Sequence, residues 1–158
     1  MGFFDDYDIP CYSEVAYNPQ MELYLCDITD MDISEGHVIG FRTQHHYGNF
    51  NDCSMKITRE DPTKAINIYI EYIDLEPGAD FLWINDNAQS TVSNKLVSLD
   101  QDIVEFRFTS DWNNYNFNGV RMMIMLGEHE TGCDFAGSRS MKDARKPKSL
   151  MKKRTDSQ

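Results

Sequence analysis

The sequence has no long hydrophobic run: no apolar stretch in its 158 residues approaches the 18 that a membrane-spanning helix needs, so we expect no membrane span. Cysteine is also sparse. Four cysteines are too few for a scaffold held by disulfides alone, and no CxxC pair marks a structural zinc site. Neither an HExxH sequence nor a serine with an activating histidine beside it occurs, so we expect no enzymatic activity.

The first ten residues, MGFFDDYDIP, lack a basic segment followed by a long apolar one, so the sequence predicts no signal peptide. Two alternatives stay open: a cytosolic protein, or a processed or excerpted domain of a secreted protein. Hydrophobic residues make up 41% of the chain, enough for one domain with a buried core. No Asn-x-Ser/Thr sequence is present, so N-linked glycan is not expected.

Basic residues are few, and they are unevenly placed. Eight of the 15 Lys and Arg, but only two of the 26 Asp and Glu, lie in residues 138–158, so residues 1–137 carry a net charge of −17. An acidic body of this kind repels nucleic acid and attracts cations, either metal ions or basic side chains of a partner. The tail has no apolar periodicity and predicts a disordered segment, which could serve as a linker, an electrostatic tether or a processing site at Lys152-Lys153-Arg154.

Alternation with a period of two dominates the middle of the chain, whereas helical periodicity is weak. Residues 66–72 place three isoleucines and Tyr72 on one face, and residues 104–108 repeat the pattern. Further short β-branched or aromatic segments lie at Met21–Leu25, Val38–Phe41, Ser54–Ile57, Asp80–Ile84 and Val120–Met125. Turn sequences separate them, among them Pro77-Gly78 and Asn118-Gly119. We therefore predict an all-β fold, an antiparallel β-sandwich or barrel.

The four cysteines are widely spaced, at positions 11, 26, 53 and 133. In a β-rich chain this even count favours two disulfides, for which three connectivities exist. Four buried thiols in a cytosolic sandwich are the alternative.

From Cys26 to about Met125 the order of these segments resembles a CUB domain, an extracellular β-sandwich module. HVIGFRTQHHYGNFNDCSMKI is similar to the family's turn-tyrosine segment, with Tyr47 six residues before Cys53. AINIYIEYIDLE is similar to the central strand that ends in Asp-Leu-Glu, DFLWIND to the next strand, and VEFRFTSDWNNYNFNGVRMMI to the final hairpin. The resemblance implies a jelly-roll-like sandwich over residues 26–133, with an irregular N-terminal extension (1–25) and a disordered basic tail (134–158).

The resemblance also implies that Cys26 and Cys53 form the family's first disulfide. The family's second disulfide is missing, and Met55 stands where the family has tryptophan. With one pair so assigned, we expect Cys11 to bond Cys133. The alternatives, that either is free or bonds another chain, stay open.

Acidic residues cluster around the predicted turn at Pro77-Gly78, which suits the two central positions of a type II turn and would fold Glu76 toward Asp80. In calcium-binding CUB domains the matching residues are ligands, together with an Asp in the last hairpin loop. The resemblance thus assigns Glu76, Asp80 and Asp111 to a Ca²⁺ site, with Asn114 and the carbonyl near Asn113 completing it. Converging carboxylates repel one another unless a cation lies between them, and an oxygen-only set favours Ca²⁺ over zinc.

Members of the family use this site to bind basic residues of other proteins. The resemblance implies a secreted, non-catalytic binding or assembly module, in which Glu76, Asp80, Asp111 and the hydroxyl of Tyr47 contact a Lys or Arg of an extracellular partner. Two alternatives are the accessory domain of a secreted protease and a carbohydrate-binding protein similar to the spermadhesins, for which Trp83, Trp112 and Tyr115 could stack on sugars. His45 and His46 are adjacent and would point to opposite faces of a strand, so we do not expect them to bind metal.

Overall fold

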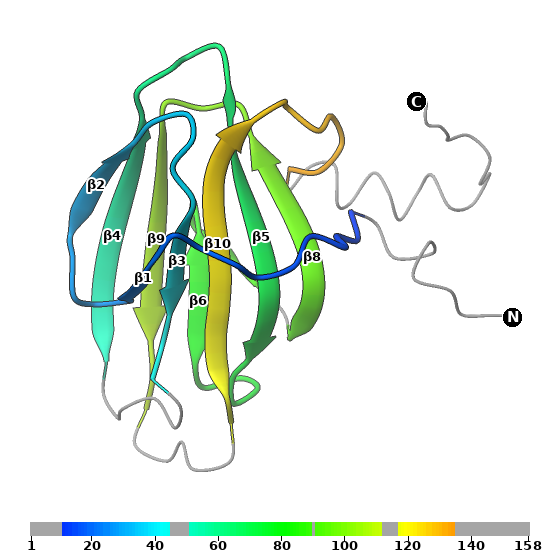
Figure 1. Cartoon of the computed structure of the whole chain (residues 1–158). Helices are drawn as coiled ribbons and strands as arrows, with labels where there is room; N and C mark the ends of the chain where they lie inside the picture. Colours follow the sequence, from blue (N-terminus) through cyan, green and yellow to red (C-terminus); the bar gives the residue numbers. More distant parts are fainter. Residues whose placement is uncertain (1–10, 45–50, 90, 112–116, 135–158) are drawn as a thin grey trace, which may run out of the picture.

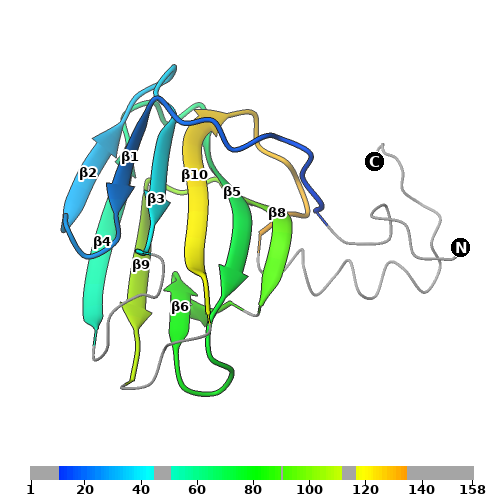
Figure 2. The ribbon, with the colours of Figure 1, turned by 60° about the horizontal axis from the view of Figure 1, so that its bottom comes forward.

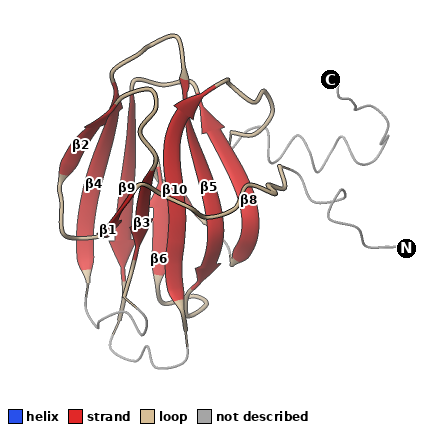
Figure 3. Cartoon of the chain, in the orientation of Figure 1, coloured by secondary structure: helices blue, strands red, loops and turns tan. Residues whose placement is uncertain are grey.

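The computed structural model describes residues 11–44, 51–89, 91–111 and 117–134. These residues form ten strands and no helix, so none of their segments is a helix able to cross a membrane (Figures 1 and 3). The strands are β1 (Met21–Tyr24), β2 (Asp30–Ile33), β3 (Ile39–Arg42), β4 (Asp52–Arg59), β5 (Ala65–Asp74), β6 (Phe81–Ile84), β7 (Asn87–Ala88), β8 (Val92–Leu99), β9 (Ile103–Thr109) and β10 (Gly119–Gly127).

Two five-stranded sheets face each other and form a sandwich. One has the order β1-β3-β10-β5-β8 and the other the order β2-β4-β9-β6-β7. The predicted all-β sandwich is confirmed, and most neighbouring strands are antiparallel. Two pairs, β1 with β3 and β2 with β4, are parallel instead. Both lie where the N-terminal strands join a sheet edge, and alternation along a single strand says nothing about the direction of its neighbour.

The alternating apolar residues build the core between the sheets. In β9, Val104, Phe106 and Phe108 point inward and are at most 2% exposed, while the residues between them face solvent. In β5 the alternation does not run to Tyr72 as predicted. A bulge opposite Arg121 and Met122 shifts the register by one residue, so Ile73 is buried and Tyr72 is only half-buried. An extra residue in one strand moves every later side chain to the other face.

Three strands, β2, β7 and β8, were not predicted. The sequence of β8, VSNKLVSL, has three polar residues after its first valine, and the edge of this half pairs with the N-terminal segment. The backbone amide of Ser13 donates to the carbonyl of Asn94, and that of Leu96 donates to the carbonyl of Cys11. Residues 11–13 thereby pair with the outer edge of β8, and the chain then crosses β5 and β10 toward β1, as Figure 2 shows in blue.

Two disulfides are present, Cys11–Cys133 and Cys26–Cys53, which are the pairings expected above. The first joins the segment before β1 to the segment after β10. Both segments lie beside β8, since the amide of Leu96 donates to the carbonyl of Cys11 and that of Ser98 donates to the carbonyl of Cys133. The second ties the segment after β1 to β4. Residues 11–25 therefore lie on the sandwich, and the basic tail from residue 135 onward lies outside the described residues.

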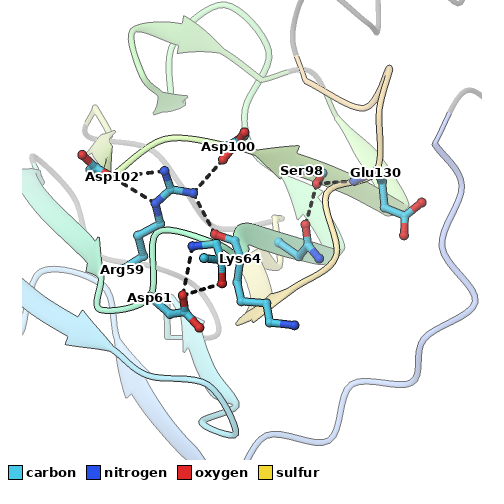
Figure 4. Close-up of polar contacts among 9 residues, drawn as sticks. Arg59, Asp61, Lys64, Ser98, Asp100, Asp102 and Glu130 are labelled. Carbon is cyan, nitrogen blue, oxygen red and sulfur yellow. Dashed lines mark hydrogen bonds and ion pairs between the residues drawn. The ribbon is translucent and has the colours of Figure 1, made fainter.

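An arginine joins the two sheets at one end of the sandwich (Figure 4). The side chain of Arg59, 9% exposed at the end of β4, is paired with Asp100 at 2.7 Å and with Asp102 at 3.1 Å, both in the turn between β8 and β9. Its Nη1 also donates to the carbonyl of Lys64, just before β5. Since β5 spans ten residues at about 3.3 Å each, the far end of β5 lies roughly 30 Å from this cluster.

Candidate metal centre

Three carboxylates meet at the other end of the sandwich. Glu76 follows β5 in one sheet, whereas Asp80 precedes β6 and Asp111 follows β9 in the other. One oxygen from each of the three lies within 4.8 Å of the other two. Asp80 is buried at 4% exposure, and the other two are half-buried. The structure therefore brings together the three acidic residues that the sequence singled out.

The turn at Pro77-Gly78 gives the site its local shape. Gly78 has a φ of +78°, as the third residue of a type II turn requires, and the Ala79 amide donates to the Glu76 carbonyl at 3.3 Å. The amide of Asp80 donates to the same carbonyl at 3.1 Å. The prediction that this turn folds Glu76 back toward Asp80 is confirmed.

Hydrogen bonds hold the loop after β9 in position. The amide of Asp111 donates to Oδ1 of Asp80 at 2.8 Å, and the neighbouring Ser110 exchanges backbone and side-chain bonds with Asn51, just before β4. The pairing of Phe81 with Thr109 places the start of β6 beside the end of β9. Sequence reasoning missed the part played by Ser110 and Asn51, because nothing local indicates which loops meet.

The electrostatics of the cluster disfavour three bare carboxylates. Burial raises the pKa of Glu76, and the hydrogen bond with Asp111 and the negative charges of Asp111 and Asp80 raise it further. A divalent cation between these oxygens would remove the repulsion and favour the ionised form. The donors are hard oxygens of carboxylates, which suit Ca²⁺ or Mg²⁺, and the wide ligand shell of Ca²⁺ leaves places for carbonyls and water.

Several of the predicted site residues cannot be placed. Tyr47, Asn113 and Asn114 lie outside the described residues. The same holds for the histidine pair at positions 45–46 and for two of the three aromatic residues considered for sugar stacking, Trp112 and Tyr115.

The third aromatic residue, Trp83, stands on the outer face of the second sheet. Its ring packs against Phe81 with centroids 5.1 Å apart, and the guanidinium of Arg107 lies 5.2 Å from its centroid. Arg107 in turn pairs with Asp52 on the next strand. Trp83 and Arg107 line a hollow of about 400 Å³, which Ser54 and Lys56 also line.

No family model matches the sequence, and no curated protein matches it. Solved structures do match. The CUB1-EGF-CUB2 region of human MASP-1/3 aligns with a TM-score of 0.51 and 17% identity over 63% of this chain and 42% of that one. The same region of rat MASP-1 aligns with a TM-score of 0.49 and 15% identity, over 64% of this chain and 44% of that one. The MASP-1 CUB2 domain bound to Ca²⁺ aligns with a TM-score of 0.47 and 18% identity, over 61% of this chain and 98% of that one.

This chain thus spans less than half the length of the two multidomain MASP-1 structures. At under 20% identity, likeness of this kind bears on the fold alone. The order of strands, the two facing sheets and the alignment with human MASP-1/3 agree on one conclusion: the chain has a CUB-like fold.

Proposed function

We propose that the chain is a non-catalytic, extracellular binding or assembly module that uses a calcium-loaded acidic site to bind a Lys or Arg of a partner protein. The observation that carries the proposal is the convergence of Glu76, Asp80 and Asp111 from two sheets at one end of the sandwich. Calcium fixes the carboxylates, and their outward lone pairs then accept charge-assisted hydrogen bonds from the basic side chain. In this scheme Asn113 and Asn114 add calcium ligands, and Tyr47 adds a hydroxyl toward the partner.

The charge of the chain supports a basic partner. With a net charge of −17 on residues 1–137, the body attracts cationic surfaces over a distance and speeds their encounter at low salt. A phosphorylated or nucleic-acid partner would meet repulsion instead.

Two features support a place outside the cell. Both disulfides occupy a chain that already has a well-packed core, and such bonds persist mainly in oxidising compartments. The CUB-like fold is the second, since the resemblance is to an extracellular module.

Thermal unfolding with calcium and with chelator tests the metal site. We expect calcium to raise the midpoint of the parent, and Glu76→Ala and Asp111→Ala to abolish the rise, because each removes one of three charged ligands. Asp30→Ala, on the exposed face of β2, is a matched control that should keep the calcium-induced rise in the midpoint. A parent whose midpoint does not respond to calcium contradicts the proposal.

A glycan-binding function is the second candidate, and the hollow beside Trp83 favours it. Its aromatic ring and paired charges offer both a stacking surface and hydrogen-bond donors and acceptors. A glycan array probed with the parent and with Trp83→Ala, each with and without chelator, separates it from protein binding. Glycan retention that needs Trp83 but not calcium would favour this second function.

A further inference from the structure

A hollow of about 320 Å³ opens directly beside the acidic cluster. Glu76 and Asp80 form part of its wall. Four apolar side chains line the rest of the wall together with the polar Gln89 and Thr91: Ile73 and Leu75 come from β5 and the residue after it, and Phe81 and Ala88 come from β6 and β7. The hollow thus lies where the margins of the two sheets meet, and both carboxylates and apolar side chains line it.

The size and lining of this hollow fit one large apolar side chain. Its volume lies at the small end of the range for ligand sites, too small for a helix or strand of a partner. Thr91, exposed just before β8, also lines the hollow and offers no charge. A second basic side chain would lose hydration against Ile73 and Leu75 without gaining a further carboxylate there.

We infer that the acidic site recognises a two-residue feature, a basic residue together with a large apolar residue one or two positions away, whose side chain fills this hollow. The inference rests on the proposed function, because the basic residue binds the same carboxylates. Consecutive Cα atoms are 3.8 Å apart, so a peptide with its cationic group at Glu76 and Asp80 brings a neighbouring side chain to the adjoining hollow.

Calcium and the apolar residue would also be coupled. The single turn Glu76–Asp80 supplies two of the three metal-site carboxylates and part of the wall of the hollow. A metal that fixes this turn also fixes the wall, and by linkage a side chain that fills the hollow tightens calcium binding by the same factor.

Synthetic peptides test the inference by NMR titration of the full chain in calcium. Each has one lysine among glycines, with leucine or alanine placed one or two positions from it on either side. We expect the best leucine peptide to bind about tenfold more tightly than its alanine counterpart, as burial of a leucine side chain implies. The amides of Gln89 and Thr91 should shift with leucine only. Thr91→Trp and, as a second variant, Ala88→Leu fill the hollow and should remove the preference, whereas Ser93→Trp, exposed on β8 and away from the hollow, should keep it.

The outcomes separate the two proposals. Equal binding of the leucine and alanine peptides, or a preference that survives both filling variants, overturns the inference and leaves calcium-dependent lysine binding in place. If the calcium-loaded chain binds no lysine peptide at all, the proposed function itself fails, and the inference fails with it. A calorimetric titration of the chain with calcium, in the absence of peptide, shows whether a failure to bind lysine peptides comes from a failure to bind the metal.

Discussion

The backbone amide of Asp111 donates to a side-chain oxygen of Asp80 at 2.8 Å. The two residues are 31 positions apart, and the bond fastens the loop after β9 to the residue before β6. Since Asp80 is buried, two of the three carboxylates of the cluster are positioned by the protein itself. Glu76 belongs to the other sheet, so a bound cation would join the turn of one sheet to the paired loops of the other.

Asp80→Asn should separate the structural role of Asp80 from its charge. The amide oxygen of asparagine can still accept the Asp111 bond, so we expect stability in chelator close to that of the parent, with calcium affinity at least about tenfold lower. Asp80→Ala loses the acceptor as well, and a buried donor left without its acceptor costs about 1–3 kcal/mol. Urea unfolding measures the stability and calorimetry the affinity. Unchanged calcium affinity in Asp80→Asn would remove Asp80 from the metal site.

Glu76→Gln should change stability in opposite directions with and without calcium. Burial and the charges of Asp111 and Asp80 raise the pKa of Glu76, so the ionised form is disfavoured in the folded, calcium-free protein. At neutral pH in chelator, the neutral variant should therefore unfold at a higher temperature than the parent. In calcium the order should reverse, because the variant lacks a charged ligand.

The pH dependence of the calcium-free parent gives an independent check on Glu76. A group whose pKa is raised by folding binds its proton more readily in the folded state than in the unfolded one. Its contribution is therefore full below the unfolded pKa near 4.5 and disappears as the pH rises through the folded value. The stability gap between Glu76→Gln and the parent should narrow on acidification. A Glu76→Gln protein less stable than the parent in chelator at neutral pH contradicts the electrostatic account of the cluster.

Local patterns in the sequence predicted local structure well. Alternation in 104–108 located β9 and its buried face, and Pro77-Gly78 predicted the turn that brings Glu76 to Asp80. The register shift that buries Ile73 was missed, because a bulge depends on the partner strand. Likewise β8 is half polar in sequence and is completed by a segment some 80 residues earlier, which no window along the chain reveals.

The residues of the candidate site also divide into those that local sequence predicts and those that depend on distant strands. Glu76 and Asp80 are close in sequence and could be joined by turn chemistry alone. Asp111 entered only through the resemblance to CUB domains, since its approach depends on the pairing of β6 with β9. The hollow beside the acidic cluster was not predicted at all. Its walls come from β5, β6 and β7, and the exposure of Phe81 and Ala88 follows from how the sheets end rather than from their residue types.

The arginine at the opposite end should give the protein an acid-sensitive contact. A hydrogen bond from Arg59 lowers the pKa of Asp100, so this carboxylate stabilises the fold above its unfolded pKa of about 3.8, and the contribution is lost as the pH falls through the lower, folded value. Asp100→Asn should lower the melting temperature at pH 6. The difference in melting temperature from the parent should begin to shrink near pH 3.8 and vanish once the pH is below the lower, folded pKa of Asp100. Asp30→Asn, an exposed control on β2, should show no such convergence. If the difference in melting temperature between Asp100→Asn and the parent stayed constant down to pH 2.5, the charge of Asp100 would not be its cause.

The disulfide Cys11–Cys133 should contribute more to stability than Cys26–Cys53. It closes a separation of 122 residues rather than 27, and the chain-entropy model gives about 5 kcal/mol for the longer loop and about 3.5 kcal/mol for the shorter. Urea unfolding of the two double Cys→Ser variants measures both. The opposite order would mean that native contacts, rather than loop length, set the contribution of each bond.

Hydrogen exchange shows what the longer bond does within the folded protein. The amides of Leu96 and Ser98 in β8 donate to the carbonyls of Cys11 and Cys133, so the disulfide holds together the two segments that cover this sheet edge. In Cys11→Ser/Cys133→Ser we expect these two amides to lose protection well beyond the global change, because their acceptors can now move away. Amides between β5 and β10, in the centre of the same sheet, should change only with global stability. If the amides of Leu96 and Ser98 instead lose only as much protection as the amides between β5 and β10, the edge of β8 stays covered without the disulfide. The disulfide would then stabilise the protein only through its effect on the unfolded chain.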